Sequence, residues 1–160
     1  MNNKKRKLDF NDGFKLVSKY HKNIYSLSEE LQNNKDIILH IVKNNNNGYK
    51  YVPEKLKNDR DIIFECVKKN NNVYKNISED LKSDTEIALV ALKKNITLLK
   101  LAPFIIRNNP DIILEIIKNN TNSFRYICKS LEYISDELKN NKNFILKVIE
   151  YNIYLSLIHI

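Results

Sequence analysis

The stretch EKLKNDRDIIFECVKKNNN, residues 54–72, decides the fold because variants of it recur along the chain. The related stretches are EELQNNKDIILHIVKNNNN at 29–47, EDLKSDTEIALVALKKN at 79–95, PFIIRNNPDIILEIIKNN at 103–120 and DELKNNKNFILKVIEYN at 136–152. Self-similarity of this kind is the signature of a repeat architecture, in which each copy is one supersecondary unit. The sequence therefore predicts a chain of repeated units rather than one irregular domain.

Equivalent apolar positions in these copies are separated by a step of 25 residues. The step relates Leu31, Leu56, Leu81 and Ile106. The next copy comes 32 residues later, at Leu138, and the seven extra residues are visible as YICKSL at 126–131 followed by YISDEL at 133–138. Seven residues are about two helical turns, so the insertion can lengthen a helix without changing its buried face. A degenerate first copy around Phe14 precedes the others.

Each copy is predicted to contain a longer helix, roughly residues 36–43 and their equivalents, because Ile38, Ile41 and Val42 share one helix face. Residues suited to the N-cap precede it, at Asn34, Asp59, Asp84, Asn109 and Asn141. An asparagine follows it, at Asn45, Asn70, Asn95, Asn120 and Asn152. Because asparagine tolerates the left-handed conformation, we expect these residues to end the helices as C′ residues.

A shorter, less regular helical piece is predicted to follow. Serine or proline recurs inside it, at Ser28, Pro53, Ser78, Pro103 and Ser135. We expect a turn there and a final helical turn after it, with serine as the cap or proline as the first helical residue. The predicted fold is an all-α α-solenoid of about five short helix-pair repeats with one seven-residue insertion. We expect residues 1–10 to be a basic flexible tail and residues 11–160 a single repeat array.

Composition supports helices and excludes several classes of site. Gly occurs twice, Pro three times and Trp not at all, which disfavours turn-rich β architectures. The two cysteines, Cys66 and Cys128, form no Cys-x-x-Cys motif, so zinc ribbons and thioredoxin-type motifs are excluded. We expect both thiols to be small buried groups in a reducing compartment.

The net charge of +8 is concentrated at the N-terminal end, because residues 1–22 hold seven cations against two acidic residues. Four of these cations are consecutive, at Lys4, Lys5, Arg6 and Lys7. Such a cluster is typical of a nuclear-import signal or of a nonspecific contact with a polyanion. A disordered basic tail that aids solubility is the alternative.

Two further sets of residues recur with the repeat. A row of lysines stands at Lys43, Lys68, Lys93 and Lys118, and it is either an interaction surface or a set of solvated charges at helix C-termini. Tyrosines recur at Tyr49 and Tyr74, and at Tyr51 and Tyr126. They suit packing better than base stacking, because other copies carry Leu99 and Leu101 at these positions.

The sequence contains no recognisable catalytic motif. His21, His40 and His159 form no motif with each other or with a cysteine, and two glycines cannot build a phosphate-binding loop. The carboxylates at Asp36, Asp61, Glu86 and Asp111 repeat with the fold, whereas a catalytic pair should be singular. We therefore expect no enzymatic activity, no catalytic residue, no cofactor and no metal.

The segment PEKLKNDRDIIFECVKKNNN, residues 53–72, resembles the tandem repeats of domain of unknown function 4116. The resemblance rests on the pattern Tyr-(Ala/Val)-(Ser/Pro)-Glu-Glu-Leu followed by Lys-x-Asn, and it extends over roughly residues 27–152. The chain departs from it where Asn, Ile or Thr replaces the glycine after Lys-x-Asn, and at the seven-residue insertion. The resemblance implies a helical repeat array and no activity.

We expect a noncatalytic, intracellular module that binds a protein or peptide along stacked repeats. The alternative is a nucleic-acid-associated protein that uses the basic residues 1–22. The expected location is cytoplasmic, with import into the nucleus if the basic cluster is a signal, and no membrane association is expected. Because IYLSLIHI at 153–160 ends in mid-unit with apolar residues, the array either continues or pairs with another chain there.

Overall fold

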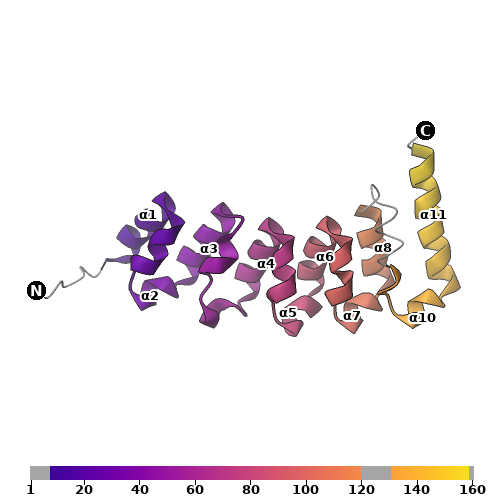
Figure 1. Cartoon of the computed structure of the whole chain (residues 1–160), viewed down its shortest axis with the longest axis horizontal. Helices are drawn as coiled ribbons and strands as arrows, with labels where there is room; N and C mark the ends of the chain where they lie inside the picture. Colours follow the sequence, from indigo (N-terminus) through magenta and orange to yellow (C-terminus); the bar gives the residue numbers. More distant parts are fainter. Residues whose placement is uncertain (1–7, 120–130, 159–160) are drawn as a thin grey trace, which may run out of the picture. The chain divides into compact units, whose positions relative to one another are not determined.

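The computed structural model describes residues 8–119 and 131–158, with side chains as far as Tyr151. The described residues form helices and contain no strand (Figure 1). Contacts group the chain into two compact units, residues 1–70 and 71–160. The predicted all-α repeat fold is confirmed.

The first unit contains two and a half copies of the repeat. Its elements are α1 (Phe10–Lys19), η1 (His21–Ser26), α2 (Glu29–Gln32), α3 (Lys35–Asn44), η2 (Gly48–Tyr51), η3 (Glu54–Leu56) and α4 (Arg60–Lys69), where η denotes a 3₁₀ helix. The long helices α1, α3 and α4 follow one another, and α3 packs against both others. The shorter piece of each copy is a 3₁₀ segment followed by one short helical turn.

The second unit repeats this order. Its described elements are η4 (Asn71–Asn76), α5 (Glu79–Ser83), α6 (Thr85–Lys94), η5 (Ile96–Leu101), α7 (Phe104–Arg107), α8 (Pro110–Asn119), α10 (Asp136–Lys139) and α11 (Lys142–Ile158). Helix α8 packs against α6 on one side and α11 on the other. The step from α6 to α8 has the regular 25-residue length, and the step from α8 to α11 carries the insertion.

The long helices from α3 onward begin at their predicted caps. The side-chain oxygens of Asn34, Asp59 and Asp84 each accept two backbone N–H groups of the first turn. Asn109 does the same for the N–H groups of Asp111 and Ile112. These bonds satisfy backbone donors that the helix itself leaves without a partner. The five predicted caps are confirmed, because Asn141 likewise accepts the N–H of Phe144 at 3.0 Å.

In each unit the core consists of apolar side chains from the long helices. Four of these helices bury two adjacent pairs one turn apart, and in the first unit these are Ile37, Ile38, Ile41 and Val42 of α3 and Ile62, Ile63, Cys66 and Val67 of α4. In the second unit they are Ile87, Ala88, Ala91 and Leu92 of α6 and Ile112, Ile113, Ile116 and Ile117 of α8. A single copy cannot cover such a wide apolar face, so burial depends on stacked neighbours.

The asparagines after the long helices do not act as predicted. Asn45, Asn70 and Asn95 adopt extended conformations, and no described non-glycine residue has a positive φ. At Asn95 the side-chain oxygen instead accepts the N–H of Thr97 at 3.1 Å and caps η5. The predicted left-handed C′ residue is therefore wrong. The asparagine side chain instead forms hydrogen bonds with backbone N–H groups of the next segment. Asn120 lies outside the described residues.

Two smaller predictions also need correction. Asn152 lies inside α11, which runs on to Ile158, so it does not end the helix as predicted. Pro53 and Pro103 are N-cap residues in extended conformations rather than first helical residues. The predicted role of serine holds at Ser28 and Ser135, whose hydroxyl oxygens accept N–H groups of the following turn.

The cysteines were expected to be buried. Cys66 is a free, buried thiol of α4, and desolvation raises its pKa to about 12. A thiol with such a pKa is almost entirely protonated at neutral pH and is therefore a poor nucleophile. Cys128 lies outside the described residues, as does most of the inserted segment.

Candidate functional site

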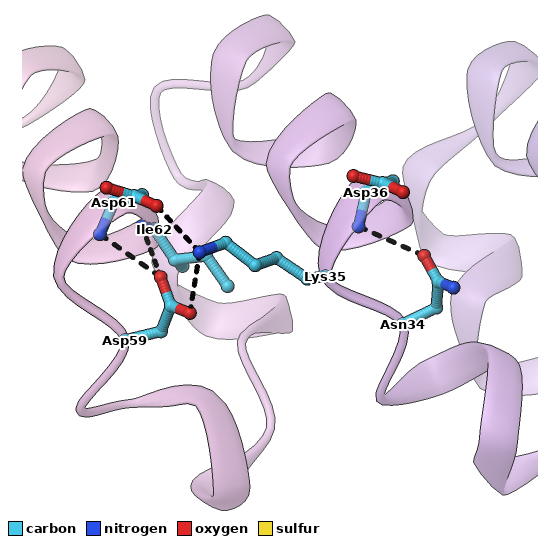
Figure 2. Close-up of polar contacts among 6 residues, drawn as sticks. All are labelled: Asn34, Lys35, Asp36, Asp59, Asp61 and Ile62. Carbon is cyan, nitrogen blue, oxygen red and sulfur yellow. Dashed lines mark hydrogen bonds and ion pairs between the residues drawn. The ribbon is translucent and has the colours of Figure 1, made fainter.

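At two of the 25-residue steps, ion pairs join one long helix to the next. In the first unit, Lys35 of α3 reaches across to α4, where its Nζ lies 2.9 Å from Asp59 Oδ2 and 2.6 Å from Asp61 Oδ2 (Figure 2). Burial opposes ionisation of Asp59, but hydrogen bonds from Lys35 and from the N–H of Ile62 lower its pKa. The same carboxylate thus caps α4 and holds the preceding helix.

The regular step in the second unit is closed in a similar way. Lys93, in the last turn of α6, forms an ion pair with Glu115 of α8. The two residues are 22 positions apart, so the pair joins the end of one long helix to the middle of the next. Lys93 is one of the four lysines of the predicted row, and its charge is used within the repeat stack.

The other lysines of the row have different surroundings. Lys43 is exposed at the end of α3. Lys68 Nζ lies 3.9 Å from Glu65 Oε1 and 6.0 Å from the ring centroid of Phe64, all on α4. Both residues belong to the first unit. The structure does not test the predicted role of the row as an interaction surface.

Lys118, the fourth lysine, borders a hollow of about 650 Å³ between α8 and α11. Its Nζ lies 4.5 Å from the ring centroid of Tyr151 on α11. The buried side chain of Leu114 forms part of the wall. From α8 the remaining lining residues are Asp111, Glu115 and Asn119, and from α11 they are Lys147 and Glu150.

Among the described residues, α8 and α11 form no ion pair equivalent to that of Lys93 with Glu115. With the 32-residue step, Lys147 occupies the position of Glu115 and Glu150 occupies that of Lys118. The partner that would close the step is therefore a second lysine, and Lys118 and Lys147 line the same hollow as like charges. Within the described chain, neither Lys147 nor Glu150 forms an ion pair.

Sequence reasoning identified Lys118 but missed Lys147, Glu150 and Tyr151. The exchange of charge at two equivalent positions is visible once the copies are aligned with a 32-residue step. Its consequence is clear only from the structure, because the ion pair between Lys93 and Glu115 depends on how α6 and α8 cross.

The hollow offers charged groups of both signs, an aromatic ring and an apolar wall. This mixture suits the backbone and side chains of a peptide, because polar groups fix orientation while apolar area supplies affinity. No group of three or more potential metal ligands occurs in the described parts of the chain. The arrangement offers recognition groups and no recognisable set of catalytic partners.

The tyrosines have unequal roles. Tyr74 is fully buried in the second unit, and its hydroxyl donates to the carbonyl of Lys82 at 2.9 Å, as expected of a packing residue. Burial raises its pKa. In the first unit Tyr25 is exposed, and its ring centroid lies 5.8 Å from that of Tyr51. Tyr126 lies outside the described residues.

The basic N-terminal end is described only in part. Lys4, Lys5, Arg6 and Lys7 lie outside the described residues. Lys15, Lys19 and Lys22 are exposed, and Lys19 Nζ lies 5.6 Å from the ring centroid of the exposed Tyr20. This end therefore presents cations next to an aromatic ring.

The two described histidines support local structure. His40 Nε2 lies 3.0 Å from Ser18 Oγ, and His21 Nδ1 lies 3.1 Å from Asn45 Nδ2. Each contact joins neighbouring copies within the first unit. His159 lies outside the described residues.

Comparison with known proteins identifies the repeat. The family model described as Domain of unknown function (DUF4116) matches residues 14–57, 34–82, 59–107, 84–131 and 127–159. No curated protein and no solved structure matches this chain. Among the described residues, no helix has both the length and the apolar character needed to span a membrane.

Proposed function

The chain belongs to the DUF4116 family of tandem helical repeats, and we propose that it is a noncatalytic module that binds a protein or a peptide. One observation carries this proposal, the hollow between α8 and α11. It lies at the 32-residue step of the repeat, and both Lys118 and Lys147 line it.

Repeat geometry supports this assignment of function. Features that recur in every copy, such as the N-caps and buried helix faces, build the stack. Lys147, Glu150 and Tyr151 depart from the pattern and all line one hollow. Side chains that are not needed for the stack are free to recognise a ligand.

Partner capture from a lysate tests the class of function. The bait is the full chain, with and without nuclease treatment, beside a variant in which Lys4, Lys5, Arg6 and Lys7 are replaced by serine. We expect a discrete protein that both baits retain after nuclease treatment. Retention of a broad set of proteins that is lost with nuclease or with the serine variant contradicts the proposal.

The second candidate is a nucleic-acid-associated protein, favoured by the exposed Lys15, Lys19 and Lys22 and by the exposed ring of Tyr20 beside Lys19. Cations would neutralise phosphates while tyrosine rings stack on bases. Such binding should fall steeply with salt concentration, which binding in the hollow should not. Fluorescence anisotropy with a single-stranded oligonucleotide at two salt concentrations distinguishes the two candidates.

The proposed location is the cell interior, because a noncatalytic module with a reduced, buried Cys66 suits a reducing compartment. Import into the nucleus through the basic cluster is part of the second candidate. Imaging of a tagged chain with and without the serine substitutions tests it.

A further inference from the structure

The first turn of α7 carries an apolar pair that no other described copy has. Phe104 is 55% exposed and Ile105 is 64% exposed. The equivalent pairs in the other copies are Glu29–Glu30, Glu54–Lys55, Glu79–Asp80 and Asp136–Glu137. Acidic residues are favoured in the first turn of a helix, so the apolar pair replaces a stabilising arrangement with an exposed one.

Packing of α7 does not require this pair. The helix is anchored by Ile106, which is buried, and by Arg107. Arg107 Nε donates to the carbonyl of Ala102 at 2.9 Å, and Nη1 donates to the carbonyl of Tyr133 at 3.1 Å. The one cation of α7 is thus turned towards the protein, and the apolar pair faces solvent.

The copies before and after α7 carry carboxylates in the first turn of their short helices. In the first unit, Lys55 Nζ lies 3.0 Å from Glu29 Oε1, 26 residues earlier in the chain. Ile105 takes the position of Lys55 in the second unit, and Glu79 takes that of Glu29. On the other side, Asn108 of α7 donates to Glu137 Oε2 of α10 at 2.7 Å.

The flanking helices carry net negative charge. Helices α5 and α10 each begin with two carboxylates, against one lysine each. Those lysines already pair within their own helices, Lys82 with Glu79 and Lys139 with Asp136. Helices α5 and α10 therefore each keep a net negative charge.

We propose that Phe104 and Ile105, between the carboxylates of α5 and α10, form a docking surface for a peptide segment that presents apolar side chains flanked by lysine or arginine. The apolar pair supplies the buried contact and the carboxylates orient the cations. This surface lies on the short helices and is separate from the hollow on the long helices α8 and α11.

Fluorescence anisotropy with defined peptides tests the proposal. The probe is a fluorescein-labelled amphipathic peptide of about 18 residues, built from leucine and lysine on opposite faces of a helix. One control peptide has glutamate in place of lysine, and the other has serine in place of leucine. We expect the leucine–lysine peptide to bind at least about tenfold more tightly than either control.

The decisive variant is F104E/I105D, which gives α7 the same acidic pair as α5. It adds negative charge at a helix N-terminus, so the melting temperature should stay the same or rise. Binding driven by charge alone would strengthen, whereas docking on the apolar pair should weaken at least about tenfold. The control L146E/I149E changes two residues of α11 with similar exposure, 47% and 46%, and should leave binding unchanged.

Three results would overturn the proposal. They are equal affinity of the three peptides for the native chain, full affinity of F104E/I105D, and equal weakening by L146E/I149E. A change in the association state of F104E/I105D, measured by sedimentation, would instead assign the surface to a second copy of this chain and would also overturn it.

Discussion

The two sides of α8 differ in how they meet their neighbours. Towards α6, after a 25-residue step, Lys93 and Glu115 form an ion pair that closes the step. Towards α11, after a 32-residue step, Lys118 and Lys147 line a hollow of about 650 Å³. At the regular step a lysine therefore meets a carboxylate, whereas at the long step two lysines border a hollow.

The largest effect should come from a fully buried residue of a long helix. Leu92 of α6 is fully buried, so Leu92→Ala should lower the free energy of unfolding by about 2–5 kcal/mol. Leu146 of α11 is 47% exposed, and Leu146→Ala should cost less than about 0.5 kcal/mol. Urea unfolding followed by circular dichroism measures both. Similar losses would contradict the assignment of Leu92 to the core and of Leu146 to the surface.

The N-caps of α8 and α11 should also differ in how much they stabilise the fold, with the cap of α8 contributing more. Asn109 accepts two N–H groups of α8, whereas the side chain of Asn141 accepts that of Phe144 in α11. We expect Asn109→Ala to cost about 1–2 kcal/mol and Asn141→Ala about half as much. Thermal unfolding of the two variants compares them, and a larger loss for Asn141→Ala would contradict this interpretation.

The regular step of the first unit should be sensitive to acid. The pKa of Asp59 lies below its ordinary value of 3.8 in the folded chain, so its contribution is present above that value and is lost as the pH falls through the folded pKa. Asp59→Asn keeps an oxygen for the cap but loses the charge, and should cost roughly 0.5–1 kcal/mol at neutral pH.

Unfolding measured from pH 7 to pH 3 checks the sign. The difference between native chain and Asp59→Asn should shrink towards low pH. Asn34, which caps α3 as an asparagine, shows that the substitution is compatible with capping. A difference that stays constant with pH would show that the ion pair between Asp59 and Lys35 does not contribute to stability.

The smallest effect on stability should come from closing the hollow. Lys147→Glu places a carboxylate where Glu115 stands in the regular step, so Lys118 gains a partner of opposite charge. We expect a stabilisation of roughly 0.5 kcal/mol that disappears at high salt, as for other exposed ion pairs. A destabilisation at every salt concentration would show that α8 and α11 do not approach as α6 and α8 do.

Much of the fold could be predicted from the sequence, because the long helices repeat both their apolar faces and their caps. Asn34, Asp59, Asp84, Asn109 and Asn141 all begin helices as expected. The helix ends were predicted less well. Asparagine can end a helix in a left-handed or an extended conformation, and the choice depends on hydrogen bonds with the next segment, as between Asn95 and Thr97.

The candidate site was only partly predictable. Lys118 was found because it repeats, whereas Lys147 and Tyr151 matter because they do not. Recognising them needs the contact between Lys93 and Glu115, which follows from the crossing of helices and not from periodicity. The apolar pair at Phe104 and Ile105 is visible in the aligned copies, but its exposure is not.

Capture of the protein partner by the native chain, by Lys147→Glu and by Lys142→Glu tests the central claim most directly. Lys142 lies in the same helix, is exposed and is not part of the hollow, so its substitution matches the change of charge. The account predicts that Lys147→Glu loses the partner while Lys142→Glu retains it, with both variants folded. Full retention by Lys147→Glu would contradict the assignment of binding to the hollow between α8 and α11.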